Sequence, residues 1–168
     1  MNLLIVDDEY LVVEEVVTVT DWELLGITEI YSATNAVSAV RILNEKKIDI
    51  MICDIEMPQT DGLELSKKAK ENFPDLEIVM LTSHAEFNYV RNALRYGCYD
   101  YLLKPVMEDD IIKVMKNLVT KIERERHQAQ LQEEGIVWNQ LKPVWKEKYW
   151  EEMLRGLRDD LNRESEEY

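Results

Sequence analysis

Short apolar runs that end at polar residues recur along the first two thirds of the 168-residue chain. They fall at 3–6, 28–32, 49–53, 77–81 and 99–103. Apolar runs of this length, bounded by turn residues, are typical of buried strands. Segments with helical spacing separate them, and this alternation predicts a parallel sheet with helices on both faces. The expected fold is therefore α/β, a doubly wound five-stranded sheet in the order 2-1-3-4-5 with a C-terminal helical extension.

Four segments between the strands are expected to be amphipathic helices. Each carries apolar residues at intervals of three or four, as a helix with one buried face requires. Asn35 is a plausible N-terminal cap, and Pro74 and Gly97 would end the third and fourth helices. The buried face of the second helix would comprise Ala36, Ala39, Val40 and Leu43. The four helices begin near Leu11, Asn35, Leu63 and Phe87.

The pattern changes after Pro105, where residues 108–134 contain neither Gly nor Pro and predict one long helix. Its apolar residues permit two interpretations: either they pack on the sheet, or they begin a short two-stranded coiled coil. They are Ile111, Met115, Leu118 and Ile122. A further amphipathic helix with three tryptophans is expected after Gly135, and it needs a packing partner. The domain prediction is 1–120 for the sheet domain and 121–168 for a helical extension.

The charge and the apolar content exclude several classes of function. A net charge of −14 argues against binding to DNA or to an anionic membrane through this chain, whereas it suits divalent cations. No apolar run is long enough to cross a membrane, and the first strand begins too early for a signal peptide. A cytoplasmic location is expected. Cys53 and Cys98 lie in or beside apolar stretches, which predicts buried, reduced thiols.

Five polar side chains stand where the predicted strands end, at the sheet edge where open α/β folds bind ligands. They are Asp7, Asp8, Asp54, Thr82 and Lys104. Three carboxylates in one crevice repel one another, and a hard cation such as Mg²⁺ would relieve that repulsion. A carboxylate nucleophile, Mg²⁺, a lysine and a hydroxyl are together the groups needed to accept a phosphoryl group.

Several ordered motifs closely resemble those of response-regulator receiver domains, over roughly residues 2–120. They are LIVDDE at 4–9, DIEMP at 54–58 with Asp61 and Gly62, LT at 81–82 and YLLKP at 101–105. The resemblance implies a flavodoxin-like fold. Three further stretches, DWELLG at 21–26, FNY at 87–89 and YDYLLKPV at 99–106, are similar to regulators that carry an AraC-type DNA-binding domain. No helix-turn-helix pattern follows residue 135, so such a domain is not part of this chain.

The resemblance implies a role for each matching residue. Asp54 would be the phosphoacceptor and would also contact Mg²⁺, which Mn²⁺ could replace. Asp8 would bind the metal directly, Asp7 directly or through water, and Glu56 through its backbone carbonyl.

The remaining matches would hold the phosphoryl group and report its presence. Thr82 and Lys104 would hold the phosphoryl oxygens, and Tyr101 matches the aromatic residue that changes rotamer in the active state. Ser83 replaces a commoner small apolar residue and His84 follows it, so the lifetime of the aspartyl phosphate is not assumed to be typical.

Three functions compete on the sequence. The expected one is a phosphorylation switch, not a turnover enzyme, that is fed by a histidine kinase. It would act as a homodimer through the face of the fourth helix, fifth strand and fifth helix, through the C-terminal helices, or through both. It would reach DNA only through a domain outside this chain. The second is a magnesium-dependent aspartyl-phosphate phosphatase, but that class generally has a second Asp where Glu56 stands. The third is a degenerate receiver used only for dimerisation, which normally lacks one of the site residues.

Overall fold

The computed structural model describes residues 1–58, 61–83, 96–134 and 136. Within these residues the strands form one parallel sheet in the order β2-β1-β3-β4-β5, which confirms the predicted fold. Asp54 and Thr82 are the last residues of their strands, whereas the sequence pattern had ended both strands one residue earlier. The strands are β1 Asn2–Val6, β2 Glu29–Ala33, β3 Ile50–Asp54, β4 Glu77–Thr82 and β5 Asp100–Leu103.

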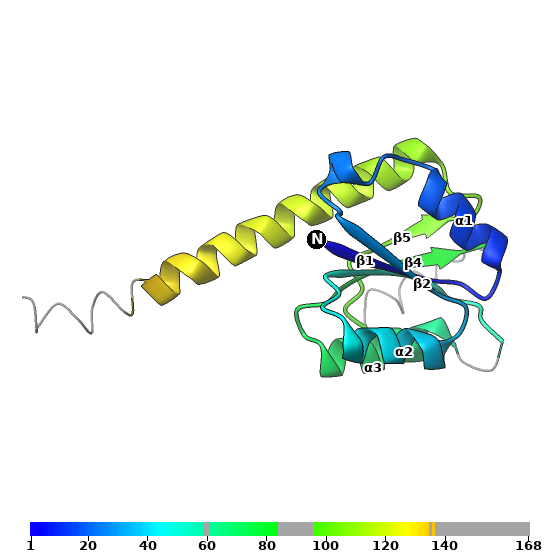
Figure 1. Cartoon of the computed structure of the whole chain (residues 1–168), viewed down its shortest axis with the longest axis horizontal. Coiled ribbons are helices and arrows are strands. Elements are labelled where there is room, and N and C mark those ends of the chain that lie inside the picture. Colours follow the sequence, from blue (N-terminus) through cyan, green and yellow to red (C-terminus); the bar gives the residue numbers. More distant parts are fainter. Residues whose placement is uncertain (59–60, 84–95, 135, 137–168) are drawn as a thin grey trace, which may run out of the picture. The chain divides into compact units, whose positions relative to one another are not determined.

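Helices cover both faces of the sheet, as predicted (Figure 1). Strand side chains alternate between the faces, and Leu4 and Val6 of β1 belong to the apolar cluster beneath α2 Ala36–Glu45 and α3 Gly62–Asn72. The opposite face carries α1 Tyr10–Thr18 and the first part of helix 108–134. Every residue of the central strands β3 and β4 is buried, which explains why these two strands read as continuous apolar runs.

Local contacts define the start of α2 and the end of the turn after α1. Asn35 caps α2 as predicted, because its side chain accepts a hydrogen bond from the backbone N–H of Ser38 at 2.8 Å. Within α2, Ala39 and Leu43 are buried, as predicted. Val40 is 44% exposed, so its assignment to the buried face was wrong. The turn after α1 forms a short 3₁₀ helix, Glu23–Leu25, which ends at Gly26 with a φ of 81°.

The apolar residues near the start of helix 108–134 are buried in the fold. Ile111, Met115 and Leu118 are fully buried, so these three residues pack within the fold and are not available to a coiled-coil seam. Residues 123–134 are all exposed. The chain divides into two compact units, Met1–Lys121 and Ile122–Tyr168. The helices expected near Phe87 and after Gly135, and with them the three tryptophans, lie outside the described residues.

Two findings in the described part of the chain concern its apolar segments. None of its helices is both long and apolar enough to cross a membrane. Cys53 and Cys98 are buried and free, as predicted. Burial raises the pKa of the Cys98 thiol to about 11, so it is protonated at neutral pH.

Candidate functional site

The carboxyl ends of four strands bring the predicted site residues to one edge of the sheet. Asp7 directly follows β1, Asp54 ends β3, Thr82 ends β4, and Lys104 directly follows β5. Pairing continues to this edge, since the backbone N–H of Lys104 donates to the carbonyl of Thr82 at 2.9 Å. The hydrogen-bonded sheet therefore fixes the backbone positions of these residues. In open α/β folds, ligands bind at this end of the strands.

Lys104 joins the two buried carboxylates of the site. Its Nζ lies 2.7 Å from Oδ2 of Asp7 and 3.1 Å from Oδ1 of Asp54. Asp7 and Asp54 are buried, with 0% and 3% of their surface exposed. Two acids that are this deeply buried require a cationic partner, because an unpaired buried charge is strongly destabilising.

A third carboxylate leaves the site with an excess of negative charge. Oxygen atoms of Asp7, Asp8 and Asp54 all lie within 4.8 Å of one another. Lys104 supplies one positive charge against three negative charges. Clustered carboxylate oxygens with uncompensated charge are the ligands that Mg²⁺ and similar hard cations prefer, so the residues present fit a divalent metal.

The protonation equilibria follow from burial and from these charges. Burial raises the pKa of Asp54, and the charge of Asp7 adds to that rise, while Lys104 opposes both. For Lys104, burial alone would lower the pKa, but the hydrogen bond with Asp7 and the charge of Asp54 outweigh it and raise the pKa. Lys104 thus stays charged at neutral pH, and ionised Asp54 is held at a cost in free energy.

The start of α3 supports Asp54 from behind, a role that the sequence pattern had not revealed. The backbone N–H of Gly62 donates to the carbonyl of Ile55 at 2.9 Å. A Cβ atom added at Gly62 would overlap the backbone carbonyl of Asp54. Asp61 caps the helix by accepting a hydrogen bond from the N–H of Leu63 at 2.9 Å. The Asp-Gly pair was recognisable as a turn, but only the fold shows that it presses against the phosphoacceptor candidate.

The other predicted residues lie around this core with different exposures. Thr82 is buried at 1% exposure, and the side chains of Glu56 and Ser83 are exposed. Tyr101 is half-buried and packs against the apolar cluster on the α2 and α3 side; in the sheet it pairs with Met80, two residues before Thr82. His84 lies outside the described residues.

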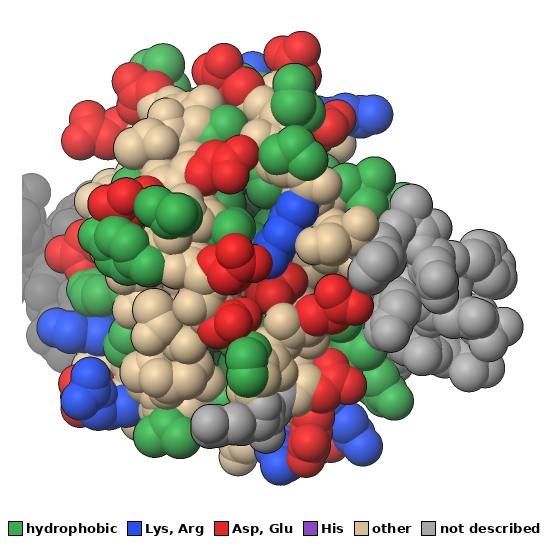
Figure 2. Space-filling model, turned by 90° about the vertical axis from the view of Figure 1, so that its right-hand side faces the viewer, with side chains coloured by type: hydrophobic (Ala, Val, Ile, Leu, Met, Phe, Trp, Pro, Cys, Tyr) green, Lys and Arg blue, Asp and Glu red, His purple; other side chains and the backbone are tan. Residues whose placement is uncertain are grey.

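Most of the charged side chains on the face onto which these strand ends open are acidic (Figure 2). Figure 2 shows a basic side chain near the centre of this face with acidic side chains around it. Such a distribution attracts cations and disfavours a free anion unless a metal accompanies it.

Comparison with known proteins assigns the family. Residues 3–116 match the response regulator receiver domain. The chain is 34% identical over 124 residues to the transcriptional regulatory protein YesN of Bacillus subtilis, covering 74% of this chain and 34% of YesN. It is 32% identical over 127 residues to the response regulator SaeR of Staphylococcus aureus, covering 76% of this chain and 54% of SaeR. The chain thus spans about a third to a half of these relatives.

Solved structures agree with the sequence match. The receiver domain of AraT, a response regulator from Geobacillus stearothermophilus, is 30% identical, with a TM-score of 0.70 over 74% of this chain and 97% of that domain. A two-component transcriptional regulator AraC from Clostridium phytofermentans, 23% identical with a TM-score of 0.69 over 75% of this chain and 98% of that one, has the same fold. The chain therefore belongs to the response regulator receiver domain family.

Proposed function

We propose that this chain is the receiver part of a phosphorylation-activated two-component response regulator, and that Asp54 accepts the phosphoryl group from a histidine kinase. The observation that carries the proposal is a buried Asp54 whose ammonium partner, Lys104, is shared with Asp7. A nucleophile needs to be ionised and held in place. Asp54 is held in place because it ends β3 and its backbone lies against Gly62.

The transfer requires each residue to act on a defined atom. A carboxylate oxygen of Asp54 forms the new bond to phosphorus while the bond from phosphorus to the histidine nitrogen breaks, and that nitrogen leaves with the electron pair. Lys104 Nζ, which lies 3.1 Å from Oδ1 of Asp54 before transfer, then pairs with a phosphoryl oxygen. The Thr82 hydroxyl donates to another. Preorganised donors aimed at the transferred group supply most of the catalysis in such reactions.

The proposed metal is Mg²⁺, which Mn²⁺ could replace. The carboxylates of Asp7, Asp8 and Asp54 would hold it together with the backbone carbonyl of Glu56. When bound, the ion would neutralise phosphoryl oxygens as a Lewis acid. The support for this proposal is the three carboxylates within 4.8 Å of one another.

Receiver domains of response regulators are signalling proteins, and the proposed activity is a single transfer followed by slow loss of the phosphoryl group. Residues 1–120 would form the receiver and residues 121–168 a helical extension. The output would be control of transcription through a DNA-binding domain outside these 168 residues. YesN and SaeR are longer proteins with regulatory names, which supports this arrangement. A cytoplasmic location and a homodimer are part of the proposal.

The test is incubation with a small phosphodonor such as acetyl phosphate and Mg²⁺, followed by intact-mass and peptide mass spectrometry. One phosphoryl group per chain is expected, on Asp54, and none in Asp54→Asn or without a divalent cation. Asp49→Asn is the matched control, since Asp49 is also buried and stands just before β3, at the other edge of the sheet. Asp8→Ala should label far more slowly. Undiminished labelling of Asp54→Asn would overturn the assignment.

A further inference from the structure

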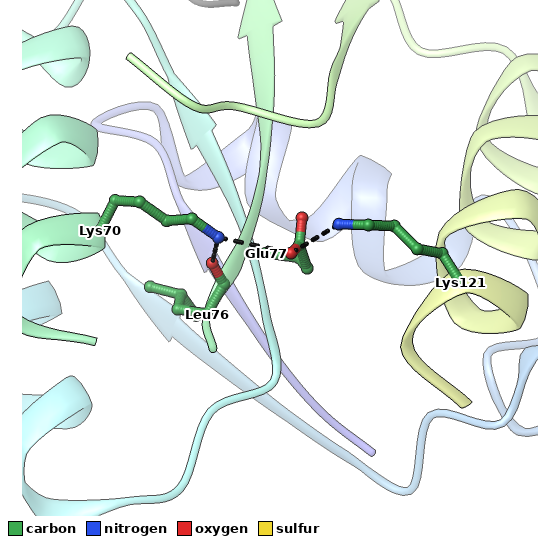
Figure 3. A network of polar contacts seen from close by, with 4 residues as sticks. All are labelled: Lys70, Leu76, Glu77 and Lys121. Carbon is green, nitrogen blue, oxygen red and sulfur yellow. Dashed lines mark hydrogen bonds and ion pairs between the residues drawn. The ribbon is translucent and has the colours of Figure 1, made fainter. Parts of the chain in front are cut away.

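A second group of charged side chains lies at the opposite edge of the sheet from the acidic site. Glu77 begins β4, the strand that ends at Thr82, and only 8% of its surface is exposed. Figure 3 shows Glu77 between Lys70 of α3 and Lys121 of helix 108–134. Its Oε1 lies 3.4 Å from Nζ of Lys70 and 2.8 Å from Nζ of Lys121.

Each lysine makes a further contact that restricts its position. Lys70 Nζ donates to the carbonyl of Leu76 at 2.7 Å, so it is already tied to the residue before β4. Lys121 Nζ lies 5.5 Å from the centre of the Tyr99 ring, a distance at which a cation and an aromatic face attract. Of the two ion pairs of Glu77, the shorter one is the pair with Lys121 of helix 108–134.

The position of Lys121 along its helix is informative. It follows Leu118 by three residues and directly precedes Ile122, so it lies beside the buried stripe of Ile111, Met115, Leu118 and Ile122. Apolar contacts are non-directional, and a stripe that repeats every turn permits a helix to slip by one turn. A charged residue beside such a stripe helps to remove this ambiguity, because a slip that keeps the apolar residues buried moves it away from its partner.

The neighbouring residues penalise the wrong registers. A slip by four residues in one direction would bring Glu125 to Glu77, which places two like charges together. A slip by four in the other direction would bring Asn117, which carries no charge. A slip by three would bring Arg124 to Glu77, but it would also move Lys121 into the fully buried position of Leu118. Penalties of this kind against alternative arrangements are a general way to make a packing specific.

We propose that Glu77 is a positioning residue that fixes the register and the end of the last helix of the sheet domain through Lys121. Lys121 is also the last residue of the first compact unit, so the ion pair stands where helix 108–134 leaves that unit. The pair keeps the helix seated up to this point, and any signal passed onward along the helix starts from a fixed residue. This role does not depend on the chemistry at Asp54.

The experiment measures amide hydrogen exchange by mass spectrometry on the 168-residue chain. In Glu77→Gln, exchange over residues 111–121 should speed up about tenfold relative to exchange in β1, as expected for local opening after loss of a partly buried charge pair. Lys121→Met, which keeps an apolar stem beside Tyr99, should give the same local increase. Lys70→Met should not.

The matched control is Glu64→Gln. It removes the same kind of group from an ion pair with Lys68 at 2.7 Å, but that pair lies on an exposed helix surface and should leave exchange over 111–121 unchanged. The proposal is overturned if Glu77→Gln behaves like Glu64→Gln. It is also overturned if exchange in Glu77→Gln rises equally in β1 and in residues 111–121, because Glu77 would then contribute only to global stability. Phosphorylation of Asp54, measured in parallel, is expected to be unchanged in these variants.

Discussion

At the scale of single residues, the acidic site is held in an electrostatically unfavourable state. Lys104 pairs with Asp7 and Asp54 at once, and Asp8 adds a third carboxylate within 4.8 Å. Such crowding costs folding free energy, and functional sites commonly carry this cost because their chemistry needs it. The structure thus predicts that charge removal at Asp54 stabilises the fold while it abolishes the proposed function.

Asp54→Asn should raise the free energy of unfolding by about 1 kcal/mol at neutral pH without divalent cations. Because the pKa of Asp54 is raised in the folded chain by burial and by Asp7, its ionised form destabilises the fold. That penalty is fully present above the raised pKa and disappears as the pH falls through it toward the ordinary value of 3.8. Urea unfolding of both chains at several pH values measures the difference. A gain that persists unchanged at the lowest pH would contradict this explanation.

Gly62→Ala tests the support behind Asp54. The added Cβ would overlap the Asp54 carbonyl, so β3 or α3 must shift, at an expected cost of about 1–3 kcal/mol. Phosphorylation by acetyl phosphate should slow at least tenfold, because small displacements of reacting groups are costly. Gly26→Ala is the control: its φ of 81° makes alanine unfavourable there too, but Gly26 is remote from Asp54. Equal rates in the two variants would show that Gly62 does not position Asp54.

At the scale of elements, the strands carry the chemistry and the helices hold the strands in place. β4 is fully buried over its six residues, and it has Thr82 at one end and Glu77 at the other. One rigid strand thus links the acidic edge to the ion pair with helix 108–134. Side-chain caps begin α2 and α3, at Asn35 and Asp61.

Asn35→Ala should destabilise the fold by about 1 kcal/mol, since it removes the side-chain acceptor for the Ser38 N–H. Asn44→Ala is matched in chemistry and lies in the same helix, but its side chain donates only to the carbonyl of Val40 on an exposed surface. It should change stability by less than about 0.5 kcal/mol. Chemical denaturation of the two variants measures the difference, and phosphorylation of Asp54 should be unaffected in both. Equal losses of stability would mean that the cap adds nothing.

At the scale of the whole molecule, the chain spans about a third to a half of YesN and SaeR, so the proposed output lies in a longer protein. The expected route from Asp54 begins with Thr82, which would donate to the phosphoryl group. Tyr101, now half-buried, would then turn further toward the core. A ligand shifts such an equilibrium only through different affinities for the two states, and Thr82 would supply that difference.

Beryllofluoride, a phosphoryl mimic, should therefore shift this chain from monomer toward dimer in sedimentation velocity, and Thr82→Ala should weaken that shift about tenfold or more in the dimer dissociation constant. Ser83→Ala is the control, because Ser83 is the exposed neighbour of Thr82. An equal shift in Thr82→Ala would remove the threonine from the route. No shift in the unmodified chain would mean that dimerisation is not its output.

Much of the fold and of the candidate site could be predicted from the sequence. The alternation of apolar runs with helical segments predicted the parallel sheet. Short continuous apolar runs indicate buried strands, and apolar residues every three or four positions indicate helices with one buried face. Asp7, Asp54, Thr82 and Lys104 could be placed together because parallel strands end at the same edge. The cap at Asn35 was also predictable, since capping is local chemistry. Val40 was misassigned because periodicity alone does not set how wide the buried stripe is.

Other features were decided only when distant segments came together. Whether Ile111, Met115 and Leu118 pack within the fold or face a second chain depends on which surface is available, and in the structure all three are fully buried. Gly62 is necessary because α3 approaches the Asp54 backbone, and Glu77 acquires two lysines from segments on either side of it in sequence. Such contacts depend on three-dimensional distance, which a pattern of residue types along the chain does not encode.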